Sequence, residues 1–207
     1  MFRKVSVCVC FTVLIAFSLA TAHSTPEHQH ATVASEKEST TLSNIVNLKV
    51  PDLELANQDG EKGRFVSDII GDKLAAVTFT YTTCNTACPV LDGIFKKVQK
   101  RLGEELGKEI ILITLSIDPV TDIPPRLKAH AEKLKAKPGW YFLTGEKQTV
   151  NRVLKALEVY SPDIFNHPPT VFVVDGKRGV WSRINGFPFT NKVLKVMDGF
   201  RIARADK

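Results

Sequence analysis

Cys84 and Cys88 are the residues of this 207-residue chain whose type and spacing most directly suggest chemistry. They follow an apolar run over 74–79 that is typical of a buried strand, and they precede an amphipathic helical pattern over 90–106. The pair is therefore expected where a strand ends and a helix begins. The unpaired N–H groups and positive dipole end of a helix favour a thiolate over a thiol. Pro89 suits the first helical turn, where its missing N–H costs no hydrogen bond.

Two thiols at this spacing can either react with each other or bind a metal. Residues four apart on a helix have Cα atoms roughly 6 Å apart, which a disulfide can bridge, and two sulfurs can also hold one soft metal ion. A disulfide that closes so short a loop stabilises a fold little, so a working site is favoured over a structural bridge. A peroxidase is disfavoured, because peroxiredoxin-like sites carry Pro and Thr where this chain has Val77 and Tyr81.

Residues 1–22 are predicted to be a secretory signal peptide. Arg3 and Lys4 precede an apolar stretch over 5–19, and Ala20-Thr21-Ala22 fits a small-x-small cleavage site. The alternative is an uncleaved N-terminal anchor, because the apolar stretch approaches the length that spans a membrane. Either reading predicts an exported protein, periplasmic or otherwise extracytoplasmic.

Export would leave one cysteine pair in an oxidising compartment. Cys8 and Cys10 lie in the predicted signal and are expected to have no role in the mature chain, which keeps Cys84 and Cys88 where disulfides persist. The formal net charge of +6 falls to +4 with the two basic residues of the signal. So small a net positive charge predicts no nucleic-acid partner but is compatible with proximity to a membrane.

Residues 23–43, rich in Ser, Thr, His and Glu, are predicted to form a disordered linker. His23, His28 and His30 could bind a transition metal loosely, although a purely polar spacer is the simpler interpretation. Residues 44–207 are then one domain.

Periodicity within 44–207 predicts alternating strands and helices. A hairpin that turns at Asp59-Gly60 comes first, and strands at 74–79, 110–117, 140–143, 170–174 and 180–184 alternate with helices at 90–106, 122–136, 148–159 and 191–205. Strands joined through helices predict a three-layer α/β fold with a mostly parallel central sheet, and the last two strands form a C-terminal β-hairpin.

A cysteine pair on a strand-to-helix turn, followed by this order of elements, resembles the thioredoxin fold. In that fold a cis-proline packs against the cysteines, and the segment 169–175 resembles the matching stretch of periplasmic thioredoxin-like reductases, so Pro169 is predicted to be cis. The fold would also place His167 beside the cysteine turn. A lone loop histidine is usually only solvated, but with two thiolates it gives an S₂N donor set. Such a set suits Cu(I) or Cu(II), whereas zinc usually needs a fourth ligand.

Four stretches carry a more specific resemblance: 79–89 around Cys-x-x-x-Cys-Pro, 116–124 with Ser-x-Asp-Pro-x-x-Asp-x-Pro, 140–145, and His167 ahead of the strand that ends at Asp175. In these stretches the chain resembles the Sco/SenC family, thioredoxin-fold copper proteins that help assemble the copper centre of cytochrome c oxidase. The resemblance implies that Cys84, Cys88 and His167 bind one copper and that the cysteines form a reversible disulfide.

The chain departs from the family pattern around these residues. Asn166 stands where an aspartate commonly precedes the histidine, Pro168-Pro169 follows it, and the segment between the cysteines lacks its usual acidic residue. Asp118 and Asp122 could line the rim of the site or contact partners. The alternative for Asp122 is a helix N-cap.

Two functions stay open at this point. One is a copper chaperone that delivers copper to the copper-bearing subunit of cytochrome c oxidase or another cuproprotein. The other is a periplasmic thiol–disulfide oxidoreductase, in which Cys84 attacks a target disulfide and Cys88 resolves the mixed disulfide. Other periplasmic copper chaperones or thiol reductases would be further partners in either case. His167 discriminates between the two, because only the first function needs it.

Overall fold

The computed structural model describes residues 44–206. The predicted signal, linker and tail histidines lie outside these described residues. The elements along the chain are β1 (Ile45–Val46), β2 (Glu54–Ala56), β3 (Lys62–Arg64), η1 (Phe65–Ile70), β4 (Leu74–Thr80), α1 (Ala87–Leu102), η2 (Gly103–Glu105), β5 (Ile110–Ser116), α2 (Pro124–Leu134), β6 (Trp140–Leu143), α3 (Lys147–Ala156), η3 (Ile164–Asn166), β7 (Thr170–Asp175), β8 (Val180–Asn185) and α4 (Thr190–Ala205).

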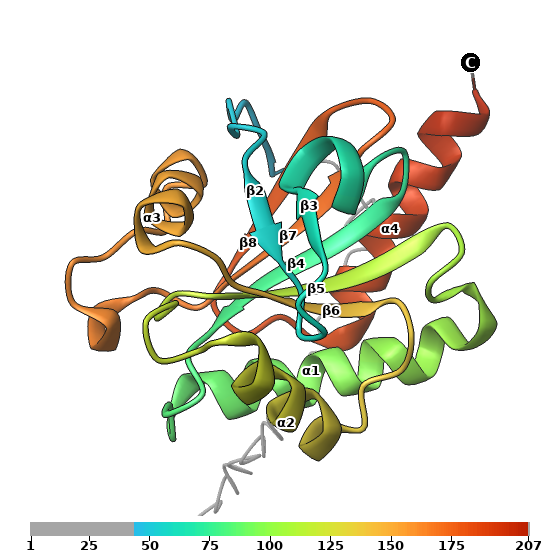
Figure 1. Ribbon diagram of the computed structural model, residues 1–207. Helices are drawn as coiled ribbons and strands as arrows, with labels where there is room; N and C mark the ends of the chain where they lie inside the picture. Colours follow the sequence, from blue (N-terminus) through green and yellow to red (C-terminus); the bar gives the residue numbers. More distant parts are fainter. Residues whose placement is uncertain (1–43, 207) are drawn as a thin grey trace, which may run out of the picture. The chain divides into compact units, whose positions relative to one another are not determined.

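The central sheet has the strand order β1-β8-β7-β4-β5-β6. Figure 1 shows its strands from β8 to β6. Strands β4, β5 and β6 run parallel, as the helix-linked pattern predicts, while β7 pairs antiparallel with β4 and β8 with β7. The register places Val77 of β4 between Ile113 of β5 and Phe172 of β7. Strands β2 and β3 form a separate N-terminal hairpin. The predicted fold class, with its two β-hairpins, is confirmed.

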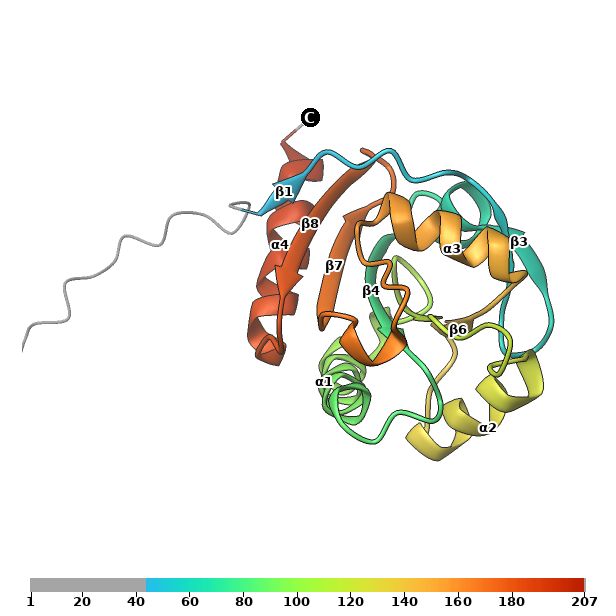
Figure 2. The same cartoon turned by 90° about the vertical axis from the view of Figure 1, so that its left-hand side faces the viewer.

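Helices cover both faces of the sheet, which is why its inner strands are apolar along their whole length. Every residue of β4 and β5 is buried. Helices α1, α2 and α4 bury their apolar stripes on one face, whereas α3 and η1 cover the other with help from the hairpin (Figure 2). The inward residues of α1 include Leu91, Phe95 and Val98. These layers hold the ends of β4 and β7 in fixed positions.

Strand β7 also anchors the C-terminal helix through a buried ion pair. Asp175 at its end is fully buried, and its Oδ1 accepts hydrogen bonds from Nε and Nη2 of Arg204 at 2.9 and 2.6 Å. The same guanidinium donates to the carbonyl of Asp72 at 2.8 Å. Arg204 thereby ties α4 to the start of β4 as well as to β7.

The prediction of a cis bond at Pro169 is wrong, because every peptide bond in the described residues 44–206 is trans. His167 is extended, with φ −76° and ψ 125°, which is the backbone region that a following proline favours. The Pro168-Pro169 pair continues this extended path into β7. The Pro169 carbonyl accepts a hydrogen bond from the Gly186 N–H at 2.8 Å. The segment 167–169 is extended and hydrogen-bonded to Gly186, so the chain enters β7 with a trans bond at Pro169.

Candidate functional site

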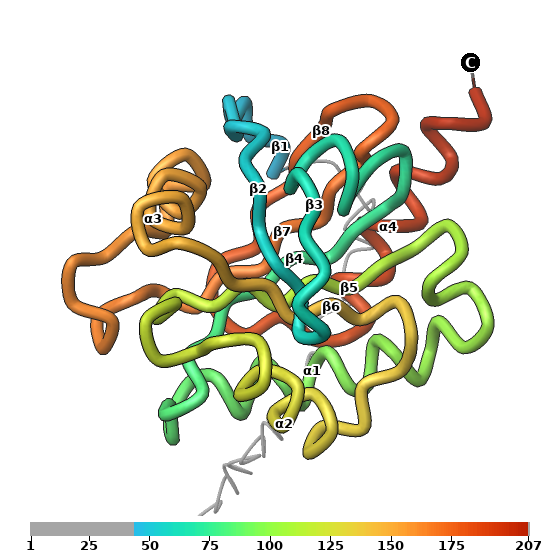
Figure 3. Tube along the Cα trace, viewed as in Figure 1, coloured from blue at the N-terminus to red at the C-terminus, as the bar shows by residue number. Residues whose placement is uncertain are grey.

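The cysteines lie where the sequence predicts them, Cys84 on the turn from β4 into α1 and Cys88 at the start of α1. Figure 3 shows the path of the chain from β4 into α1. Cys84 is partly exposed in the turn, and Cys88 is buried in the first helical turn; both are free thiols. The Cys84 N–H donates to the Tyr81 carbonyl at 2.9 Å, which closes the turn. The backbone N–H of Cys88 points at Sγ of Cys84 over 3.4 Å. An unpaired donor of the helix N-terminus thus meets the thiol sulfur, as the strand–turn–helix pattern suggests.

The two thiols differ strongly in acidity. Partial burial alone would raise the pKa of Cys84, but hydrogen bonds from the Cys88 thiol and from the N–H groups of Cys88 and Thr86 outweigh it and lower the pKa to about 7. Burial, and next the hydrogen bond with Cys84, raise the pKa of Cys88 to about 12. Near neutral pH, a large fraction of Cys84 is therefore thiolate, whereas Cys88 keeps its proton. This split makes the exposed sulfur the nucleophile and the first ligand available to a metal.

Asp122 holds the cysteine turn in place from the loop that follows the neighbouring strand β5. Its fully buried carboxylate accepts hydrogen bonds from the Thr82 N–H at 3.1 Å, the Thr82 hydroxyl at 2.5 Å and the Ser116 hydroxyl at 2.7 Å. Helix α2 has Ile123 as its N-cap residue and no side-chain cap, so the alternative of Asp122 as a helix cap is wrong. The carboxylate instead joins Thr82, which lies two residues before Cys84, to Ser116 at the end of β5.

The rest of the Ser-x-Asp-Pro stretch shapes the turn that presents Asp122. The Asp118 N–H donates to the Ser116 hydroxyl at 3.0 Å, and the Asp118 carbonyl accepts from the Asp122 N–H at 2.8 Å. Arg126 of α2 adds a contact to the cysteine turn, because its Nε donates to the Thr82 hydroxyl at 2.8 Å. Sequence reasoning missed the roles of Thr82 and Arg126, since both depend on contacts between residues about forty positions apart.

His167 lies in the loop between η3 and β7, partly buried against the end of β4. Its ring meets Phe79 edge-on with centroids 6.0 Å apart, and its Nδ1 is buried without a hydrogen-bond partner. Burial lowers the pKa of His167, which favours the neutral imidazole that metals bind. Asn166 does not orient the ring: its amide donates to Asp163 Oδ2 at 2.7 Å. Buried polar atoms normally have a hydrogen-bond partner or a ligand, so the unpaired Nδ1 of His167 marks a position where one can bind.

The structure brings the two cysteines together but does not bring His167 into a ready-made cluster with them. Within residues 44–206, no three His, Cys, Asp or Glu side chains are arranged to hold a metal ion. The histidine loop and the cysteine turn do share one edge of the sheet, because β7 begins where its antiparallel partner β4 ends. The donor types of the two thiols and the imidazole fit a soft metal.

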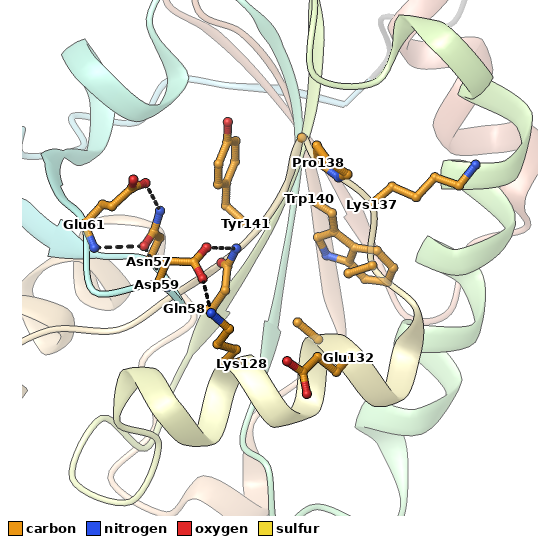
Figure 4. Close-up of a pocket in the computed structure, with 13 residues that line it drawn as sticks. Asn57, Gln58, Asp59, Glu61, Lys128, Glu132, Lys137, Pro138, Trp140 and Tyr141 are labelled. Carbon is orange, nitrogen blue, oxygen red and sulfur yellow. Dashed lines mark hydrogen bonds and ion pairs between the residues drawn. The ribbon is translucent and has the colours of Figure 1, made fainter.

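A hollow of about 350 Å³ lies elsewhere, between the β2–β3 hairpin tip, α2 and β6 (Figure 4). Lys128 and Asp59 form an ion pair of 2.9 Å at its wall, and the Gln58 side chain accepts from the Phe142 N–H at 2.8 Å. None of the described residues that line this hollow is a cysteine or a histidine. The hollow lies beside the outer edge of β6 and shares no lining residue with the cysteine site.

Comparison with known proteins bears on the same segments. The model of the SCO1/SenC family matches residues 46–198, which include both cysteines, Asp122 and His167. The chain belongs to the SCO1/SenC family. This membership confirms the resemblance carried by the Cys-x-x-x-Cys-Pro and Ser-x-Asp-Pro stretches.

Individual members of the SCO1/SenC family resemble the chain over part of its length. An SCO1 protein homolog of Bacillus subtilis (strain 168) is 32% identical over 109 residues, which cover 52% of this chain and 55% of that protein. The chain spans about half the length of the curated relatives it matches.

Two solved structures show the common fold. A SCO1/SenC family lipoprotein from Bacillus anthracis str. Ames superposes with a TM-score of 0.65 at 24% identity, covering 78% of this chain and 99% of that one. Yeast Sco1 with copper bound superposes with a TM-score of 0.63 at 18% identity, covering 75% and 94%. The architecture is therefore that of the Sco proteins.

No helix within residues 44–206 is both long and apolar enough to cross a bilayer.

Proposed function

We propose that this protein binds one copper ion through Cys84, Cys88 and His167 and delivers it to a copper centre, that of cytochrome c oxidase or of another cuproprotein. The observation that carries the proposal is the unpartnered, buried Nδ1 of His167 at the sheet edge where Cys84 presents a low-pKa thiol. Membership of the SCO1/SenC family supports it, as does the copper in the yeast Sco1 structure.

Copper capture would use the two thiols in order of their acidity. Cys84 offers a thiolate near neutral pH, and Cys88 must lose its proton as the metal binds, so uptake releases protons and strengthens as the pH rises. His167 enters as the neutral ligand, and its imidazole lets the set hold Cu(II) as well as Cu(I). A partner thiolate or imidazole would then remove the copper by replacing these ligands one at a time.

Thiol–disulfide exchange is a second function that the difference in acidity favours. The Cys84 thiolate would attack a target disulfide, form a mixed disulfide and release one target thiolate. Cys88 would then lose its proton and attack Sγ of Cys84, which releases the second target thiolate and leaves the Cys84–Cys88 disulfide. Another thiol reductase of the same compartment would supply the two electrons for the next cycle. This reaction would prepare target cysteines to accept copper.

We infer that copper delivery and thiol–disulfide exchange take place outside the cytoplasm. The predicted signal over 1–22 supports that location, and the Bacillus anthracis relative is described as a lipoprotein. Other extracytoplasmic copper chaperones would then load the site.

Titration of the reduced protein with Cu(II) tests the proposal. Sulfur-to-copper charge-transfer absorption should saturate at one equivalent, and competition with a chelator should show at least tenfold weaker binding in His167→Ala. His130→Ala is the matched control, because His130 is also partly buried but pairs with Asp92 at 3.1 Å on the α1–α2 contact. Equal affinity of wild type and His167→Ala would reject the three-ligand site and leave the thiol–disulfide function.

A further inference from the structure

Large apolar side chains are exposed around the cysteine turn. Seven of the nine such residues in the described part of the chain lie in segments at this edge of the sheet. One of them, Tyr160, has its ring under the Lys155 ammonium, 4.8 Å from the ring centroid, and the other six form one set. Phe189 is 87% exposed, Phe165 79% and Val120 67%. We call this set the apolar rim; its members are Val90, Val120, Ile123, Phe165, Phe187 and Phe189.

The topology explains why segments far apart in sequence share this edge. Strands β4 and β5 are parallel, so the cysteine turn and the 117–123 loop both leave the sheet here. Strand β7 is antiparallel to β4, so the 160–169 loop enters here, and β8 is antiparallel to β7, so the 186–189 loop leaves here. Four loops therefore surround the cysteines at one end of the sheet.

Hydrogen bonds and a ring contact connect these loops to the cysteine turn or to each other. The Cys84 N–H donates to the carbonyl of Tyr81, whose ring meets Phe165 edge-on with centroids 6.1 Å apart. On the same side, the Gly186 N–H donates to the Pro169 carbonyl, which ties the loop of Phe187 and Phe189 to the histidine loop. On the other side, Asp122 joins the cysteine turn to the loop of Val120 and Ile123. These contacts fix the loops that carry most of the rim relative to the cysteine turn.

Charge at this edge differs from that of the chain as a whole. The four loops, 81–86, 117–123, 160–169 and 186–189, contain none of the 28 Lys and Arg residues. They do contain three acidic residues: the carboxylates of Asp118 and Asp163 accept hydrogen bonds from their own turns, and that of Asp122 is fully buried and hydrogen-bonded to Thr82 and Ser116. Arg126 approaches from α2 but donates to the Thr82 hydroxyl. Anionic lipid or nucleic acid would need basic groups here, so an apolar protein surface without excess acid fits better.

We propose that the apolar rim is the docking face for a partner protein whose own copper-binding or redox cysteines lie in an apolar, non-acidic surface. The inference rests on the proposed function, because ligand exchange and mixed-disulfide formation both need a partner sulfur in contact with Cys84. A partner that reaches this sulfur must cover the surrounding loops. Burial of large exposed phenylalanines under a partner removes apolar surface from water, and this burial would supply much of the binding energy.

The test uses the soluble copper-bearing domain of cytochrome c oxidase as the probe, with the full mature protein in its reduced, copper-loaded form. Isothermal titration calorimetry gives the Kd of the complex for wild type, for Phe165→Ser/Phe189→Ser and for Ile202→Ser. Ile202 is a matched control because it is 64% exposed but lies near the far end of α4. We expect the double variant to bind at least tenfold more weakly and the control to bind like wild type. Circular dichroism and copper titration should confirm that both variants fold and bind one copper.

Each outcome separates the docking face from the proposed function. If wild type binds copper and the probe but the double variant binds the probe equally well, the rim is not the docking face, although the copper function stands. If wild type binds no copper, the proposed function itself fails. Binding to vesicles of phosphatidylcholine is measured last. If the double variant loses vesicle binding but still binds the probe, the rim faces a membrane and the inference is overturned.

Discussion

Replacing Asp122 by alanine should loosen the cysteine turn while leaving both thiols in the chain. The carboxylate is fully buried and accepts three hydrogen bonds that join Thr82 to Ser116. Hydrogen bonds to a charged group contribute roughly 1.5–3 kcal/mol each. Thr82 is only half-buried, so water can replace part of what it loses. We therefore expect a loss of about 3 kcal/mol in the free energy of unfolding rather than the full sum.

Urea unfolding of the reduced, metal-free protein measures this loss directly. A change of about 3 kcal/mol corresponds to a fall of roughly 6–12 °C in Tm for a domain of this size. Asp122→Asn should cost less, because it keeps the volume and one acceptor oxygen. Asp118→Ala is the matched control, since the Asp118 carboxylate accepts one long bond of 3.4 Å from the Thr121 N–H.

The same variant should also alter the chemistry of Cys84. A looser turn weakens the backbone hydrogen bonds that lower the thiol pKa, so the pKa of Cys84 should rise above about 7. Alkylation rates measured from pH 5 to 10 give this pKa. If Asp122→Ala unfolds within 0.5 kcal/mol of wild type and keeps the same alkylation profile, the carboxylate does not hold the turn and the reasoning is refuted.

Three further predictions follow from other contacts. Because the pKa of Cys84 is about 7 and the thiolate is the reactive form, its alkylation rate should rise about tenfold between pH 6 and pH 8. The alkylation rate of a thiol with an ordinary pKa of 9.0 would rise nearly a hundredfold, and that result would exclude a stabilised thiolate. Arg204→Leu should cost about 3 kcal/mol in urea unfolding, because it leaves the buried Asp175 carboxylate without its main partner; a loss under 1 kcal/mol would show that water or Arg178 replaces it. His167→Ala should change the stability of the metal-free protein by less than about 1 kcal/mol, since its Nδ1 is unpaired there, so a large loss would mark a structural role.

Local sequence patterns predicted the elements that position the cysteines. The buried runs of β4 and β5 and the apolar stripe of α1 are encoded in consecutive residues, so the strand–turn–helix site could be found without coordinates. Strand β1 was not predicted, because two residues carry no periodicity and form a strand only by pairing with β8. The predicted signal over 1–22 and linker over 23–43 remain predictions.

Features that depend on distant contacts could not be predicted in the same way. The isomer at Pro169 is decided by how the loop meets Gly186 and the sheet, and the fold analogy gave the wrong answer. The role of Asp122 depends on Thr82, which is forty residues away in sequence. The copper ligands remain a prediction from the family pattern, because His167 reaches the same sheet edge as the sulfurs without completing a metal cluster.

The central claim is that one copper is held by two sulfurs and one imidazole nitrogen. X-ray absorption fine structure of the reduced protein loaded with one equivalent of copper measures this ligand set most directly. We expect two sulfur scatterers and one nitrogen scatterer with the multiple scattering of an imidazole ring, and loss of the imidazole signal in His167→Ala but not in His130→Ala. A wild-type spectrum with sulfur ligands alone, or one unchanged by His167→Ala, would contradict the account.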